Sequence, residues 1–140
     1  MQPFLLVDDN DKYAELLSSY FKKHGFQFER AFDAREGWDL YQKNAPDYYP
    51  LIVTDVTMET QTSGLGMLKK IHRSGYQGTI IIASTGFDVI FAKTLTKLFL
   101  RSTGVHYMIP KTTVLSEAPV FYPIGFFEKP GSDFPGLVQA

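Results

Sequence analysis

Short apolar runs that alternate with segments of helical periodicity constrain the fold of this chain more than any other feature. The runs are rich in Ile, Val, Leu and Phe and include residues 4–7, 51–54 and 79–83. Between them, apolar residues recur every three or four positions, as expected for helices that pack on a sheet. Parallel strands joined by crossover helices produce this alternation. The sequence therefore predicts an α/β fold.

Turn and capping residues divide the predicted elements. One apolar stripe follows the first strand and ends at Gly25, which is a helix stop signal. Residues 26–32 alternate as in a second, partly exposed strand, and Asp33 is placed to cap the next helix. The stripe of the first helix consists of Tyr13, Leu16, Leu17, Tyr20 and Phe21.

Composition limits the classes of protein that the chain can belong to. Its 140 residues, of which 44% are hydrophobic, suit one globular domain spanning 1–140. The absence of cysteine excludes a disulfide framework and a thiolate zinc site. A net charge of -1 with scattered Lys and Arg argues against direct nucleic-acid binding. No signal-like or membrane-like segment opens the chain, so we expect a cytoplasmic location and no membrane partner.

Three carboxylates follow two of the predicted strands directly. Asp8 and Asp9 come after the first strand, and Asp55 comes after the third. Crowded carboxylates repel one another and are driven to protonate unless a cation lies among them. A hard divalent ion such as Mg²⁺ prefers oxygen ligands of this kind. The sequence therefore predicts a magnesium site at the carboxyl ends of the strands.

Four segments together resemble the motifs of bacterial response-regulator receiver domains, over roughly the first two-thirds of the chain. They are Phe4-Leu5-Leu6-Val7-Asp8-Asp9-Asn10, Thr54-Asp55-Val56-Thr57-Met58, Gly64-Leu65 and Ser84-Thr85-Gly86. An acidic pair, a later single Asp and a still later hydroxyl residue form a specific set. The resemblance implies a flavodoxin-like, doubly wound parallel sheet of five strands in the order 2-1-3-4-5.

The resemblance also implies a phosphoacceptor function in a two-component phosphorelay. Asp55 would be the nucleophile that takes a phosphoryl group from the phosphohistidine of a sensor histidine kinase or phosphotransfer protein. Asp8, Asp9, Asp55 and the backbone carbonyl of Thr57 would hold Mg²⁺. The hydroxyl of Thr85, or that of its neighbour Ser84, would bind a phosphoryl oxygen and bias a partner-binding surface.

Such a domain also needs a lysine after its fifth strand, and the chain offers two. Lys111 fits the usual spacing better, whereas Lys129 fits the usual motif better because Phe126 precedes it and a proline follows it. We assign Lys129, with Lys111 as the alternative. That assignment makes residues 104–122 an insertion before the fifth strand, with room for a small hairpin. It also leaves the last helix short or missing.

Departures from the family pattern support a second interpretation. Glu59 stands where the family usually has proline, and Met108 would fill the usual aromatic switch position if Lys111 is the site lysine. The alternative function is therefore a phosphorylation-independent receiver that acts as a protein interaction module. An enzyme that turns over an external substrate is not expected. A haloacid dehalogenase-type phosphatase would need a second Asp at Thr57, and a flavin site would be repelled by the acidic first loop.

Two further expectations concern the predicted helix that contains residues 89–100 and the three histidines. Apolar residues from Val89 to Leu100 spread around more of that helix than one core-facing stripe requires. They predict either a face covered by other parts of the chain or a surface for an effector or a homodimer. His24, His72 and His106 lack metal-ligand spacing, and we assign them no site role.

Overall fold

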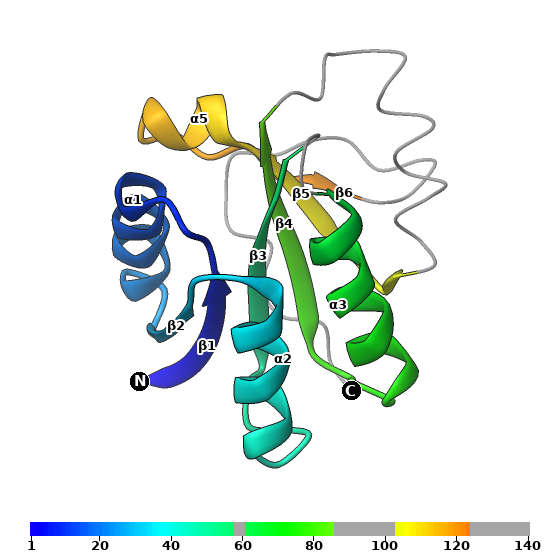
Figure 1. Cartoon of the computed structure of the whole chain (residues 1–140). Helices are drawn as coiled ribbons and strands as arrows, with labels where there is room; N and C mark the ends of the chain where they lie inside the picture. Colours follow the sequence, from blue (N-terminus) through cyan, green and yellow to red (C-terminus); the bar gives the residue numbers. More distant parts are fainter. Residues whose placement is uncertain (58–60, 86–102, 124–140) are drawn as a thin grey trace.

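One six-stranded sheet organises the parts of the chain that the computed structural model describes, which are residues 1–57, 61–85 and 103–123 (Figure 1). The strand order is β2-β1-β3-β4-β5-β6. The first five strands pair in parallel, and β6 pairs antiparallel with β5. The strands are β1 (Gln2–Val7), β2 (Phe26–Ala31), β3 (Leu51–Thr57), β4 (Thr79–Thr85), β5 (Tyr107–Pro110) and β6 (Tyr122–Pro123).

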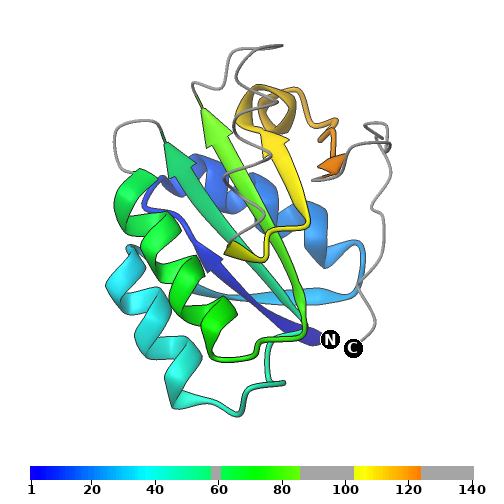
Figure 2. The ribbon, with the colours of Figure 1, turned by 90° about the vertical axis from the view of Figure 1, so that its right-hand side faces the viewer.

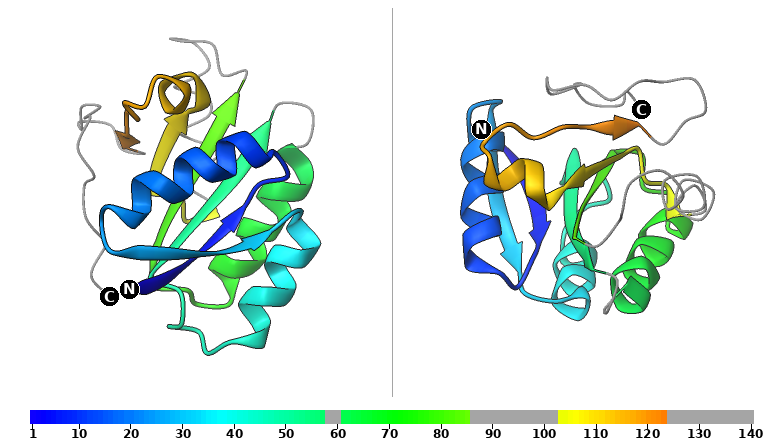
Figure 3. Two further views of the ribbon diagram at one scale, coloured as in Figure 1. Left: turned by 90° about the vertical axis from the view of Figure 1, so that its left-hand side faces the viewer. Right: turned by 90° about the horizontal axis from the view of Figure 1, so that it is seen from above.

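Helices cover both faces of the sheet. Those in the described ranges are α1 (Asp11–Lys22), α2 (Ala34–Lys43), α3 (Gln61–Arg73) and the short α5 (Lys111–Leu115). α1 and α5 lie on one face, whereas α2 and α3 lie side by side on the other (Figures 1 and 2). The predicted α/β fold and the order 2-1-3-4-5 are confirmed, and β6 adds an antiparallel edge strand (Figure 3). The helix that follows the fifth parallel strand is α5, with five residues, and the end of the chain, where the short last helix was predicted, lies outside the described residues.

The central strands are apolar on both faces, as a sheet covered by two helix layers requires. Leu5 and Leu6 are adjacent in β1, and both side chains are fully buried. Leu5 belongs to the core beneath α2 and α3, whereas Leu6 belongs to the core beneath α1 and α5. Alternation of side chains along a strand therefore supplies both cores from each run of apolar residues.

Gly37 allows α2 to approach the sheet closely. A β-carbon at this position would lie 2.7 Å from the sulfur of Met67 and 2.8 Å from Cγ2 of Val7. Real β-carbon contacts are essentially never so short, so any larger residue would push α2 away from α3 and β1.

Short polar side chains cap α1 and α2, and the cap at Asp33 was predicted from the sequence. The Asn10 side chain accepts a hydrogen bond from the Tyr13 N–H at 3.1 Å and so begins α1. Asp33 caps α2 by accepting from the Glu36 N–H at 2.8 Å. Capping by short polar side chains satisfies amide groups that have no partner in the first helical turn. Within the described ranges the longest helix, α3, has 13 residues, whereas about 20 apolar residues are needed to cross a bilayer.

The fifth parallel strand differs from the sequence interpretation. We placed residues 104–122 as an insertion ahead of a strand ending at Lys129, but Tyr107–Pro110 within that segment pairs in parallel with Ile81–Ser84. Met108 and Ile109 are both buried, one toward each core, so this run has the pattern of a covered strand. The hairpin considered as an alternative does form between β5 and β6, as part of the main sheet. Lys129 lies outside the described residues.

Residues after α5 fold back over the α1 face. Phe121 is 2% exposed, and its ring lies 5.9 Å from the Tyr20 ring and 6.3 Å from the Tyr107 ring, measured between centroids. The Val120 N–H donates to the Thr113 hydroxyl at 3.1 Å. These contacts tie the segment before β6 to α1, α5 and β5.

Replacing Phe121 with alanine tests this packing. We expect the free energy of unfolding to fall by about 3 kcal/mol, because a buried aromatic ring would leave a cavity between α1 and β5. Denaturant unfolding measures the loss. Leu115→Ala is the control, since Leu115 is 44% exposed on α5 and its truncation should change little. Equal effects of the two substitutions would show that Phe121 does not belong to the core.

His106 joins the beginning of β5 to β4. Its backbone N–H donates to the Ile80 carbonyl at 2.9 Å, and the Nδ1 atom of its imidazole accepts from the backbone N–H of Ile80 at 3.1 Å. An amide N–H can only donate, so Nδ1 must be unprotonated. Burial lowers the pKa of the imidazole, and the nearby His72 lowers it further. The folded state therefore favours neutral His106.

This arrangement predicts a pH dependence of stability. Because the pKa of His106 is lowered on folding, its contribution is complete above the unfolded value of about 6.5 and is lost as the pH falls toward the folded value. His106→Asn offers an oxygen in place of Nδ1 and cannot titrate. We expect its stability to change less than that of the native chain between pH 7 and pH 5, as measured by urea unfolding. An unchanged pH dependence would contradict the assignment.

Candidate functional site

The parallel register brings the candidate site residues to one edge of the sheet. Val7 pairs with Thr54, so the next residues along the two strands, Asp8 and Asp55, come side by side. β5 pairs with the side of β4 that faces away from β3. In this pairing Ser84 lies opposite Pro110, and Lys111 follows Pro110 directly. Because side chains alternate along strands, Asp8 and Asp55 point to the same face as Leu6 and Val53, the face that α1 and α5 cover.

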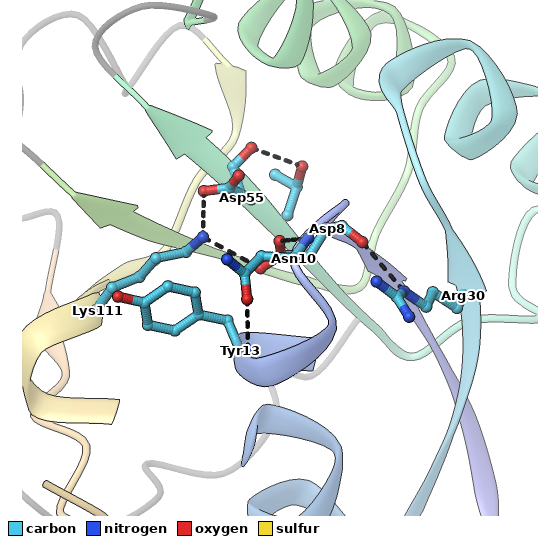
Figure 4. A network of polar contacts seen from close by, with 7 residues as sticks. Asp8, Asn10, Tyr13, Arg30, Asp55 and Lys111 are labelled. Atoms are coloured by element: carbon cyan, nitrogen blue, oxygen red, sulfur yellow. Dashed lines mark hydrogen bonds and ion pairs between the residues drawn. The ribbon is translucent and has the colours of Figure 1, made fainter. Parts of the chain in front are cut away.

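Asp8 is held at the carboxyl end of β1 and is 1% exposed. Its Oδ1 accepts a hydrogen bond from the Asn10 N–H at 2.9 Å, and its Oδ2 lies 3.2 Å from Nζ of Lys111 (Figure 4). Burial raises the pKa of the Asp8 carboxyl, and the opposing effects of the Asn10 N–H and the Lys111 ammonium do not cancel it. The negative charge of Asp55 acts in the same direction as burial.

Asp55 lies within β3, two residues before the end of the strand. Its side chain is 13% exposed, and its Oδ1 lies 2.8 Å from Nζ of Lys111. The carboxylate is therefore partly accessible from solvent while one oxygen is paired with a cation. The Thr54 hydroxyl donates to the backbone carbonyl of Asp55 at 3.3 Å and supports this part of the strand.

Lys111 is the lysine that the structure brings to the acidic cluster. It is the first residue of α5, and its side chain is 3% exposed. Its Nζ lies between the two carboxylates and 4.2 Å from the centroid of the Tyr13 ring (Figure 4). The spacing argument had favoured Lys111, whereas Lys129, which the motif argument favoured, lies outside the described residues.

Three carboxylates form a group that could hold a metal ion. One oxygen from each of Asp8, Asp9 and Asp55 lies within 4.8 Å of the others. Asp8 Oδ2 and Asp55 Oδ1 are buried and make no hydrogen bond, although both are ion-paired with Lys111. One ammonium balances only part of the charge of three carboxylates. A hard divalent cation with oxygen preference therefore fits this group.

Arg30 is a site residue that sequence reasoning missed. Its Nε donates to the backbone carbonyl of Asp8 at 3.1 Å, and its Nη1 lies 2.8 Å from the Asp11 carboxylate. The guanidinium also lies over the Phe32 ring, 4.2 Å from its centroid. It thereby holds the loop that follows β1. The parallel pairing of Leu6 with Arg30 was the signal available, since it places this arginine beside the acidic loop.

The structure describes only some of the other predicted residues. Thr57 ends β3, and Ser84 and Thr85 end β4, where Thr57 pairs with Thr85. All three therefore lie at the same edge of the sheet as the carboxylates. Met108 is buried in β5, three residues before Lys111. Three further predictions concern residues outside the described part of the chain: the apolar face of residues 89–100, Glu59 and Phe126.

A family model decides what kind of domain carries this site. The model of the response regulator receiver domain matches residues 4–116. The chain belongs to this family. Receiver domains are signalling domains that generally do not act as enzymes, and they interact with histidine kinases or phosphotransfer proteins. They typically bind Mg²⁺ at an acidic pocket, and this receiver domain has an acidic cluster at the corresponding edge of the sheet.

The sequence of one curated relative is also similar to this chain. A curated relative from Bacillus subtilis (strain 168), described as the uncharacterized transcriptional regulatory protein YcbL, is 31% identical over 85 residues. The match covers 61% of this chain, and the chain spans about a third of that relative, 36% of its length.

Solved structures agree as well. The Francisella response regulator 1452 receiver domain has a TM-score of 0.63 at 23% identity, and the comparison covers 84% of this chain and 93% of that one. A Wolinella succinogenes N-terminal domain has a TM-score of 0.61 at 27% identity and coverages of 79% and 82%. TrrA of Thermotoga maritima has a TM-score of 0.51 at 25% identity and coverages of 60% and 70%.

The raised pKa of Asp8 leads to a prediction about stability. Without a divalent ion, the contribution of Asp8 is complete below its unfolded pKa of about 4 and is lost as the pH rises through the higher folded value. Asp8→Asn keeps an oxygen for the Asn10 N–H and removes the charge. We expect it to be more stable than the native receiver domain at pH 7 in chelator, by roughly 1 kcal/mol.

Magnesium should reverse that order. An ion that binds only the folded state raises the midpoint of thermal unfolding, by an amount that grows with the logarithm of the free ion concentration above the dissociation constant. We expect Mg²⁺ to stabilise the native receiver domain but not Asp8→Asn. Asp39→Asn, at an exposed position of α2, is the matched control and should respond like the native chain. Lower stability of Asp8→Asn in chelator would contradict the argument.

Proposed function

We propose that this receiver domain accepts a phosphoryl group on Asp55 from a phosphohistidine of a sensor histidine kinase or phosphotransfer protein. The observation that supports it most is the placement of Asp55 Oδ1 2.8 Å from Lys111 Nζ, beside Asp8 and Asp9. Transfer of a phosphoryl group depends mainly on positioning and on balancing charge. This edge of the sheet offers an accessible carboxylate, a buried ammonium and a set of oxygen ligands.

The transfer step balances in atoms and charge. A carboxylate oxygen of Asp55 attacks phosphorus, the phosphorus–nitrogen bond of the phosphohistidine breaks, and the imidazole leaves with the bonding electron pair and takes up a proton. Mg²⁺, held by Asp8, Asp9, Asp55 and the carbonyl of Thr57, would offset the negative charge on the phosphoryl oxygens. TrrA of Thermotoga maritima, which is described in complex with Mg(2+)-BeF, supports this assignment.

Lys111 has two roles in the proposed phosphoryl transfer, one before the transfer and one after it. Before transfer, its ammonium orients the Asp55 carboxylate and lowers the repulsion between Asp55 and Asp8. After transfer, the same ammonium pairs with a phosphoryl oxygen, because the acceptor has become a neutral acyl group with a charged phosphate attached. Burial of the side chain, at 3% exposure, strengthens both interactions by excluding water.

The response to phosphorylation is assigned to the end of β4. The hydroxyl of Thr85, or that of Ser84, would donate to a phosphoryl oxygen and bias a surface that binds a partner. Met108 lies at the position where a rotating aromatic residue would be expected from the family pattern. We therefore propose that coupling in this receiver domain does not use rotation of an aromatic side chain at the position of Met108. Slow hydrolysis of the acyl phosphate by the domain itself would end the signal.

Intact-mass measurement after incubation with acetyl phosphate tests the proposal. We expect a phosphoryl adduct that forms with Mg²⁺, is absent in chelator and is lost in Asp55→Asn. Lys111→Met should slow adduct formation by roughly 10- to 100-fold, since it removes one positive charge beside the reacting group. Lys43→Met, at an exposed position of α2, is the matched control.

Two results would overturn the proposal. An adduct that persists in Asp55→Asn would place the acceptor elsewhere. No adduct in the native chain, under conditions that label another receiver domain, would instead favour the interaction module that acts without phosphorylation. Circular dichroism of each variant separates loss of the adduct from loss of the fold.

A further inference from the structure

Tyr13 belongs to a closed set of contacts at the acidic cluster, which links it to Asn10, Asp8 and Lys111. The Asn10 N–H donates to Asp8 Oδ1, the Asn10 side chain accepts from the Tyr13 N–H, and the Tyr13 ring faces Lys111 Nζ at 4.2 Å. Lys111 Nζ in turn lies 3.2 Å from Asp8 Oδ2. Each member is thus held by two others. The turn that shapes the acidic loop therefore also places the backbone of Tyr13, whose ring lies over the ammonium.

The Tyr13 ring occupies a side of the ammonium that the carboxylates do not. An ammonium has three N–H groups, and here two carboxylates lie near it at 2.8 and 3.2 Å. The face of an aromatic ring attracts a cation through its quadrupole. The ring also keeps water from the ammonium, which is consistent with the 3% exposure of the Lys111 side chain.

The short helix that carries Lys111 makes this contact more important. α5 has five residues, and its N-cap residue, Pro110, makes no side-chain hydrogen bond to the helix. The position of the ammonium therefore depends on contacts at the tip of a long, flexible side chain. Two of those contacts are to oxygens of Asp8 and Asp55, which a divalent ion would also take as ligands.

We infer that Tyr13 is a positioning residue that keeps the Lys111 ammonium in the site when a divalent ion competes for the oxygens of Asp8 and Asp55. The ring can do this because it is not a metal ligand of the kind that Mg²⁺ prefers. Its attraction for the ammonium persists when the carboxylates are shared with the ion. This inference rests on the proposed function, and it assigns to Tyr13 the retention of the proposed phosphoryl-binding cation.

Two substitutions separate the ring from its hydroxyl. Tyr13→Phe keeps the aromatic face, whereas Tyr13→Leu keeps a large apolar side chain without it. Tyr20→Leu is the matched control, because Tyr20 is a half-buried tyrosine two turns further along α1, and its ring contacts Phe21 and Phe121. Any general effect of losing a tyrosine from this helix face should appear in Tyr20→Leu as well.

The first readout is exchange of the Lys111 ammonium protons with water, followed by proton–nitrogen NMR of the full chain with and without Mg²⁺. We expect Tyr13→Leu to accelerate exchange by about fivefold, which corresponds to a cation–π contact of about 1 kcal/mol, and more strongly with Mg²⁺ present. Tyr13→Phe should stay within about twofold of the native chain. Tyr20→Leu should leave the exchange unchanged.

The second readout is the rate of Asp55 phosphorylation by acetyl phosphate at saturating Mg²⁺. Tyr13→Leu should slow it by about 3- to 10-fold, and Tyr13→Phe should restore it. Equal exchange in Tyr13→Leu and the native chain would overturn the inference, as would equal losses in Tyr13→Phe and Tyr13→Leu. If the native chain forms no adduct, the proposed function fails, and the exchange measurement still decides whether Tyr13 retains Lys111.

Discussion

The parallel register of β1, β3 and β4 is the constraint on which the rest of the structure depends. It sets Asp8 beside Asp55 and brings the start of α5 to the same edge of the sheet. A one-residue slip of β1 would turn Asp8 toward α2 and α3 and move Leu6 out of the α1 core, and the same slip of β3 would do this to Asp55 and Val53. The apolar packing of the strands and the geometry of the site are therefore fixed by the same pairing.

Charge balance at this edge is incomplete within the protein itself. Lys111 is buried between two carboxylates, and Arg30 holds the acidic loop through the Asp8 carbonyl and the Asp11 side chain. Replacing a buried ion pair by packed apolar side chains is often neutral or stabilising, because buried ions lose their hydration. The arrangement is consistent with the proposed binding of an ion and a phosphoryl group, which would complete the charge balance.

The fold could be predicted from local patterns, whereas the site could be predicted only in part. Alternating apolar runs and caps at Asn10 and Asp33 determine the elements and depend on neighbours in sequence. The acidic cluster could be predicted because Asp8, Asp9 and Asp55 directly follow apolar runs that are typical of strands. The contacts of Lys111 and Arg30 depend on register between distant segments, which no local motif encodes. β6 has only two residues, which is too short for any periodicity to identify.

The antiparallel edge strand also affects how the sheet meets other chains. An open strand edge offers unpaired amide and carbonyl groups to which another strand can add. β6 covers the outer side of β5 and ends in Pro123, which has no N–H to donate. Within the described ranges, growth of the sheet by strand addition is thus disfavoured at this edge, and β2 at the opposite edge has no strand paired on its outer side.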